Sequence, residues 1–269
     1  MTDDKEFIAS IYPQYNSLMN WILSKMGDSF FIDVEITWMW TFLIKGIAGE
    51  AQCVLYKALK DAAYIEEYYG SKDTADYYSE TGDKVRNYIN NTFWDEERGV
   101  YVERFIDKRY SDVVFADFNA YAVTLGVADH ERGFRIVQYL KDNMWTEYGS
   151  ATTDKKADSN PDISWAHNKA VWPFINGYEV EANFILDKDK EAFELIERCW
   201  GNMLDKGTAT FWEFVGGNGE FPIEPVLKGS FHDTMDSYCH GWSGWVSYLM
   251  QRYIAGLKPV LPGFRKFEI

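Results

Sequence analysis

The sequence predicts an all-α fold built from antiparallel pairs of helices, and three observations support this prediction. Apolar residues recur every three to four positions in most long segments, which is the period of one face of a helix. Alternating, strand-like patterns are few and short. The connections between helical segments alternate between short and long, as in helices joined into hairpins.

The helices can be placed along the chain by this periodicity. The first is expected over residues 4–26, and the second carries an apolar face opposite charged residues between positions 54 and 66. Further helices are expected over 72–92, 115–126, 130–143 and 164–185. Two more apolar faces repeat the helical spacing: Ala192, Leu195, Ile196, Cys199, Trp200 and Met203, and then Trp242, Trp245, Val246, Leu249 and Tyr253.

Strand and loop signals are confined to a few places. The alternating segment 99–105 follows a turn-like run, so we expect at most one small β-hairpin, near 98–106. Long loops are expected over 146–163 and 216–232, and long loops often carry function. No exact sequence repeat is present. Roughly nine or ten helices, wrapped into a ring, would form an α/α toroid with a site at one mouth. We expect one domain over residues 1–269.

The composition excludes several classes of function. A net charge of −15 without a basic stripe argues against nucleic acid as a partner. The four histidines show no metal-ligand spacing, and no glycine-rich nucleotide motif occurs, so no metal or cofactor is expected. No apolar run approaches the ~20 residues of a membrane span. Three scattered cysteines and an N-terminus without a signal-peptide pattern indicate a cytoplasmic protein that does not bind membranes.

Two aromatic segments with titratable groups indicate a carbohydrate site. Glu213 directly follows Phe211 and Trp212 and precedes a glycine-rich loop, and His240 stands two positions before Trp242. Sugar rings stack their C–H faces on aromatic side chains, and a positioned carboxylate can activate water. We therefore expect Glu213 and His240 to line one pocket, with Trp212 or Trp242 beside them.

Two other groups of residues are weaker candidates for sugar contacts. His167 lies between Trp165 and Trp172, although aromatic residues at helical spacing more often belong to a core. Asp33 and Glu35 precede a Trp-Met-Trp cluster. These two acids are either N-terminal acids that complement a helix dipole or a source of catalytic acid.

Several segments together resemble the inverting α-L-rhamnosidase family of glycoside hydrolases. The resemblance is carried by Phe193–Leu204, by Ala209-Thr210-Phe211-Trp212-Glu213, by Cys239-His240-Gly241-Trp242-Ser243 and by Tyr253–Phe264, with looser matches at 31–33, 93–101 and 118–126. It implies an (α/α)6 barrel in which Glu213 is the general base and His240 contacts sugar hydroxyls. Asp33 falls near a family segment at the same mouth. Segment 165–179 is more similar to glucosidase and trehalase families of the same fold.

The chain departs from this family where the general acid is expected. The family carries that acid upstream in an Arg-x-Glu…Trp-x-Gly-Asp segment, which this sequence lacks, and helices for a full twelve-helix ring are missing. The leading hypothesis is an inverting, α-L-rhamnosidase-like glycoside hydrolase that acts on a rhamnoside or related glycoside. The alternative is a catalytically incomplete sugar-binding protein or a fragment of a larger glycosidase.

Overall fold

The computed structural model is described for residues 3–33, 47–104, 113–154, 170–216, 219 and 237–269. Its long helices are α1 (Lys5–Met26), α2 (Gly49–Tyr69), α3 (Lys72–Thr92), α4 (Ala116–Thr124), α5 (His130–Met144), α6 (Pro173–Ile185) and α7 (Asp189–Ile196). Helix α7 continues into the π-helical turn η3 (Glu197–Gly201) and α8 (Asn202–Asp205). The last helical stretch comprises η6 (Gly241–Gly244), α9 (Trp245–Leu249) and η7 (Met250–Ile254).

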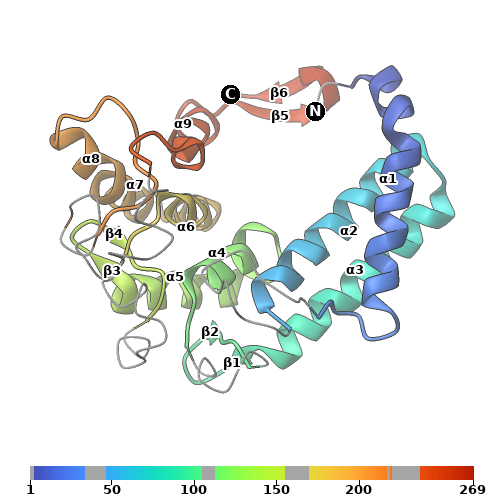
Figure 1. Cartoon of the computed structure of the whole chain (residues 1–269), viewed down its shortest axis with the longest axis horizontal. Coiled ribbons are helices and arrows are strands. Elements are labelled where there is room, and N and C mark those ends of the chain that lie inside the picture. Colours follow the sequence, from blue (N-terminus) through green and yellow to red (C-terminus); the bar gives the residue numbers. More distant parts are fainter. Residues whose placement is uncertain (1–2, 34–46, 105–112, 155–169, 217–218, 220–236) are drawn as a thin grey trace.

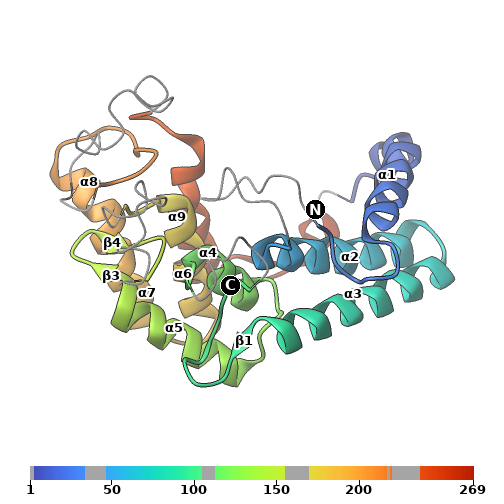
Figure 2. The same ribbon diagram turned by 60° about the horizontal axis from the view of Figure 1, so that its bottom comes forward.

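The helices form two layers arranged in an arc (Figures 1 and 2). Helices α2, α4, α6 and α9 pack against one another in that order and form the inner layer. Helices α1, α3, α5 and α7 pair with them on the outside. Gly177 lets α6 approach α9 closely, since a Cβ there would lie 1.3 Å from the Trp245 ring. The described chain therefore has the hairpins of an α/α toroid, and the fold class predicted from the sequence is confirmed.

The outer helices α1, α3 and α5 begin after residues of types that commonly act as N-caps. The side chains of Asp4, Ser71 and Asp129 accept hydrogen bonds from backbone N–H groups in the first turns of α1, α3 and α5. These caps satisfy donors that have no partner inside the helix. Pro173 begins α6, where its missing N–H costs nothing. Of the helix expected over 164–185, residues 164–169 lie outside the described residues and 170–172 are not helical.

Within the described residues, three small antiparallel pairs of strands connect or follow the helices, where the sequence predicted at most one. They are β1 (Trp94–Asp95) with β2 (Val100–Tyr101), β3 (Trp145–Thr146) with β4 (Gly149–Ser150), and β5 (Lys258–Leu261) with β6 (Lys266–Glu268). The first lies at 94–101 and not at 98–106, because Gly99, at a φ of 71°, is in the turn. Strands of two to four residues carry too little alternation to be read from sequence.

A buried side-chain amide ties inner helix α4 to the hairpin that precedes it. Asn119 accepts a hydrogen bond from the Tyr101 N–H (2.9 Å) and donates to the Tyr101 carbonyl (2.9 Å). It also donates to the carbonyl of Phe115, the N-cap of α4, at 2.9 Å. One side chain thus satisfies both backbone groups of a buried strand residue and a carbonyl of the helix start.

The same arrangement recurs at α2 and α6, always at the fourth residue after the N-cap. Gln52 bonds the N–H and carbonyl of Ile32 and the carbonyl of Ala48, the N-cap of α2. Asn176 bonds the N–H and carbonyl of Ser150 and the carbonyl of Trp172, the N-cap of α6. The six hydrogen bonds are 2.8–3.0 Å long. We call Gln52, Asn119 and Asn176 the amide clamps. They are an internal structural repeat without a sequence repeat.

The core consists of two clusters of buried apolar side chains. The larger spans α1 to α6 and includes Leu59, Ile136 and Leu140. The smaller lies among α6 to α9 and includes Trp200 and Leu249. None of the described helices is long and apolar enough to span a membrane.

Removing one amide clamp should strongly destabilise the protein. Asn119→Ala leaves the N–H and carbonyl of Tyr101 buried without partners, at a cost of about 2–5 kcal/mol. Urea unfolding measures this loss. The exposed Asn87→Ala on α3 is the matched control and should change stability by less than about 0.5 kcal/mol. Equal stabilities of the two variants would show that the clamp does not hold the hairpin.

Candidate active site

The inner helices α2, α4 and α6 begin next to one another, and we call the region around their first residues the mouth. Gly49, at the start of α2, lies so close to α4 that a Cβ would sit 2.1 Å from the Phe118 ring. Isolated β-bridges then join the segments that enter or flank the inner helices: Phe115 with Thr153, Ala151 with Val171, and Val171 with Val215. The starts of α2, α4 and α6 and the segment around Glu213 are therefore neighbours in space.

Glu213 and His240 lie together at the mouth, as expected from the sequence. Glu213 Oε2 accepts a hydrogen bond from the Ser237 N–H (3.1 Å) and lies 3.5 Å from His240 Nδ1. Backbone bonds join Glu213 to Ser237 (2.9 Å) and His240 to Phe211 (3.0 Å), so the two segments run side by side. The side chains remain 14% and 29% exposed, respectively. This leaves a carboxylate that is held in place and still reaches solvent.

Trp242 supplies the aromatic surface beside this pair. Its indole N–H donates to the Glu213 carbonyl (3.2 Å), and its ring centroid is 4.1 Å from that of His240. Phe174 and the buried Trp172 lie behind it, with centroids at 5.4 and 6.0 Å. The indole is therefore fixed next to Glu213 by one hydrogen bond and a stack of rings.

Trp212 belongs to the core, which corrects the expectation that it contacts sugar beside Glu213. Its side chain is 4% exposed and packs in the smaller core cluster. The backbone N–H of Trp212 donates a hydrogen bond to the Met203 sulfur at 3.3 Å, and its backbone carbonyl accepts one from the Ser243 hydroxyl. Successive side chains of an extended segment point to opposite sides, so Trp212 turns inward where Glu213 turns to the mouth.

The remaining predicted residues are only partly described. Asp33 is exposed, next to Ile32, which Gln52 clamps. Trp172 is buried at the start of α6 and supports Trp242. His167 and Glu35 lie outside the described residues.

Three buried carboxyl groups at the mouth were not singled out from the sequence. Glu50 and Asp117 stand in the first turns of α2 and α4, and Glu103 follows β2. Glu103 accepts two hydrogen bonds from the Gly49 N–H, at 2.9 and 3.1 Å, and interacts by hydrogen bonding with the carboxyl of Glu50. Asp117 accepts from the Phe118 N–H at 2.8 Å. We call Glu50, Glu103 and Asp117 the carboxyl cluster.

Burial favours the protonated forms of the acids in this carboxyl cluster. It raises the pKa of Glu50 and Asp117 well above the ordinary range, and neighbouring carboxylates add to both shifts. The pKa of Glu103 rises, chiefly by burial, to about 8. A hydrogen bond between two carboxyl groups also requires a shared proton. Among the described residues Glu50 Oε1 is buried without a hydrogen-bond partner. The protonated form is therefore favoured for buried acids that lie beside the mouth.

One sequence signal could have indicated this cluster. Asp117 is the only charged residue in Val113-Val114-Phe115-Ala116-Asp117-Phe118, and an acid within an apolar run is seldom solvated. Glu50 carries no such signal, because an acid in a first helical turn is ordinary. Within the described residues, no group of three or more potential ligands is arranged to hold a metal ion.

Comparisons with known proteins agree with this architecture. The family model described as amylo-alpha-1,6-glucosidase matches residues 24–218. A GH78 family rhamnosidase of Bacillus sp. GL1 superposes with a TM-score of 0.72 at 24% identity, over 99% of this chain and 26% of that one. A rhamnosidase from Klebsiella oxytoca with rhamnose bound gives 0.66 at 20% identity, over 91% and 42%.

The fold is shared more widely than with rhamnosidases. Neutral trehalase Nth1 from Saccharomyces cerevisiae gives a TM-score of 0.55 at 17% identity, over 76% of this chain and 37% of that one. At these identities the structures establish a common fold. The chain spans about a quarter of the length of the Bacillus enzyme.

The carboxyl cluster should make stability depend on pH. A carboxyl whose pKa is higher in the folded protein contributes stability that is full below the ordinary Glu pKa of 4.5 and is lost as pH rises through its folded value, about 8 for Glu103. Glu103→Gln imitates the protonated form and should flatten this decline by up to about 1.4 kcal/mol per pH unit. Urea unfolding of both proteins, repeated at one-unit intervals between pH 5 and 8, measures the slope of the free energy of unfolding against pH. The exposed Glu131→Gln on α5 should decline like the wild type, and a Glu103→Gln slope that matches it would contradict the assignment.

Proposed function

The chain belongs to the amylo-alpha-1,6-glucosidase family, and from this premise we propose that it is a glycoside hydrolase that cleaves with inversion at the anomeric carbon. The single observation that carries the proposal is the placement of two kinds of carboxyl group at one mouth. Glu213 is solvent-reaching and paired with a histidine. The carboxyl cluster is buried, which raises the pKa of each of its three acids. Inverting hydrolysis needs one carboxylate as base and one carboxylic acid as proton donor.

Glu213 is proposed as the general base. Ser237 and His240 hold Oε2 from one side, which fixes the carboxylate against the protein and leaves it reachable by water. A positioned carboxylate can take a proton from that water as it attacks the sugar. Trp242 lies beside the carboxylate and offers the face against which a sugar ring would stack.

The carboxyl cluster is proposed as the source of the catalytic proton. Burial raises the pKa of its acids, whereas Glu213 reaches solvent, and acid–base catalysis uses carboxyl groups in two such different environments. Glu50 has the oxygen without a partner among the described residues. It is therefore the member proposed to hand a proton on, since burial and the neighbouring Glu103 raise its pKa.

We propose an α-L-rhamnoside as the substrate class. We also propose that residues 1–269 form one domain. The support is the likeness of the fold to two rhamnosidases and the sequence resemblance around Glu213 and His240. The family model instead favours an α-1,6-glucoside. Hydrolysis rates on aryl α-L-rhamnosides and aryl α-glucosides separate the two.

A sugar-binding protein without turnover is the alternative function. Two observations favour it. The chain covers only 26% of the Bacillus enzyme. A complete six-hairpin ring also has more helices than the described residues supply. An open ring leaves the site wetter and weakens the electrostatic interactions that catalysis uses. Calorimetric binding of rhamnose without hydrolysis of any aryl glycoside would identify this function.

Removal of the proposed base should abolish most turnover. Glu213→Gln is expected to lower kcat on an aryl α-L-rhamnoside by about 10²–10⁴-fold with little change in KM, because the amide cannot take the proton from water. Glu197→Gln, at an exposed position of η3, is the control and should keep wild-type rates. NMR of the first-formed sugar should show the inverted anomer. Retention, or full activity in Glu213→Gln, would refute the proposed mechanism.

The two tryptophans that flank Glu213 in sequence or space should differ in their effects. Trp242→Ala should weaken sugar binding, measured as a higher KM or Kd, since the proposed stacking face is lost. Trp212→Ala should act on folding and lower the free energy of unfolding by about 3–5 kcal/mol, as for other buried aromatics. The opposite outcome would contradict this assignment. Loss of sugar binding in a Trp212→Ala variant of unchanged stability would show that Trp212 contacts the sugar.

A further inference from the structure

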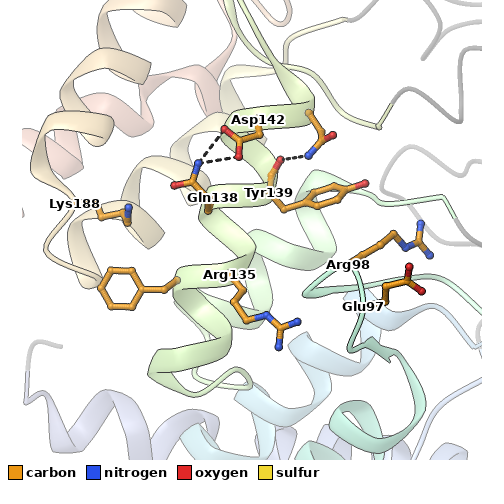
Figure 3. Close-up of a pocket in the computed structure, with 9 residues that line it drawn as sticks. Glu97, Arg98, Arg135, Gln138, Tyr139, Asp142 and Lys188 are labelled. Atoms are coloured by element: carbon orange, nitrogen blue, oxygen red, sulfur yellow. Dashed lines mark hydrogen bonds between the residues drawn. The ribbon is translucent and has the colours of Figure 1, made fainter.

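A hollow of about 510 Å³ lies on the outer layer, along the solvent-facing side of α5 (Figure 3). Its size falls within the range of small-ligand sites. The turn of the β1–β2 hairpin borders it with Glu97 and Arg98, and Lys188 borders it from the junction of α6 and α7. Helix α5 faces the core with its other side, so this hollow is separate from the mouth.

The hollow presents paired hydrogen-bonding groups on one face of α5. Gln138 and Asp142, both exposed, are one helical turn apart, and the Gln138 amide donates to both carboxylate oxygens at 2.9 Å. Asn143 donates to the Tyr139 carbonyl at 2.9 Å, which leaves its amide oxygen to accept. These contacts fix the orientation of polar groups that can still bond a ligand. Hydroxyl groups, which both donate and accept, suit such a set.

Aromatic rings accompany these polar groups. Phe134 lines the hollow with the Lys188 ammonium 5.6 Å from its ring centroid. Tyr139 donates its hydroxyl to Asp154 at 3.0 Å, so its ring is held in place. Flat apolar faces next to fixed hydrogen-bonding groups are the two features that recognise a sugar ring.

The charges at the hollow are largely compensated, which favours a neutral ligand. Arg98 pairs with Asp95 at 2.9 Å, and Arg135 bonds both the carboxylate and the backbone carbonyl of Glu96. Glu97 and Asp142 add two further acids to the same surface. An anion would find no surplus of positive charge here.

We propose that this hollow is a secondary binding site for a neutral carbohydrate chain, which holds a polymeric substrate on the outer surface while the mouth acts on an end of it. The inference rests on the proposed function as a glycoside hydrolase, since it names a polymer as the substrate class. The hollow binds the chain without chemistry.

Affinity electrophoresis of the native protein in gels that contain glycogen, a neutral rhamnan or anionic polygalacturonate tests this site. The wild type should be retarded by a neutral polysaccharide. Gln138→Ala/Asp142→Ala should weaken this retention by about fivefold or more, as expected for the loss of two hydrogen-bonding side chains. The matched control is Asp83→Ala/Asn87→Ala, an exposed acid and amide one turn apart on α3, which should be retained like the wild type. Phe134→Leu, which keeps most of the apolar volume, should also weaken retention.

Turnover of a small aryl glycoside separates this site from the mouth. The Gln138→Ala/Asp142→Ala variant should hydrolyse it at the wild-type rate, and Glu213→Gln should lose turnover but keep retention. Absence of turnover in the wild type would refute the proposed function and leave retention as an independent result. The secondary site is overturned if neither neutral polysaccharide retards the wild type, if only polygalacturonate does, or if both double variants behave alike.

Discussion

The amide clamps are the interaction on which the rest of the structure depends. Each of Gln52, Asn119 and Asn176 joins a segment that returns from an outer helix to the start of the next inner helix. A buried strand residue whose N–H and carbonyl lack ladder partners would destabilise the fold by several kcal/mol. One amide satisfies both groups and also a carbonyl of the helix N-cap. The clamp therefore sets where α2, α4 and α6 begin, and it does so in the same way in these successive hairpins.

Because the clamps align the starts of the inner helices, they also decide the electrostatics of the mouth. Helix N-termini carry partial positive charge, which favours acids such as Glu50 and Asp117 in their first turns. Burial acts in the opposite direction and outweighs the dipole, so these acids hold their protons. Glu213 comes from an extended segment and not from a helix, and it reaches solvent. One architecture thus places buried acids and a solvent-reaching acid around the same opening.

The extended segment that carries Glu213 is itself fixed by the core on both sides. Trp212 packs into the smaller core cluster and Phe214 into the larger one, while Val215 pairs with Val171. The backbone of Glu213 therefore cannot shift without disturbing both clusters. This explains why the aromatic residue next to Glu213 in sequence is structural, and why Trp242, which is distant in sequence, is the aromatic residue beside the carboxylate.

The sequence by itself determined the helical class, the approximate bounds of most helices, and the meeting of Glu213 with His240. Apolar periodicity and N-cap residues act locally, so they can be read along the chain. Only the tertiary structure decided that Trp212 is buried, that the clamps repeat, and that Glu50, Glu103 and Asp117 share one buried place. A carboxyl in a first helical turn looks the same in sequence whether solvent or a second helix covers it. Its burial, and hence its pKa, depends on contacts between residues more than fifty positions apart along the chain, such as Gly49 with Glu103.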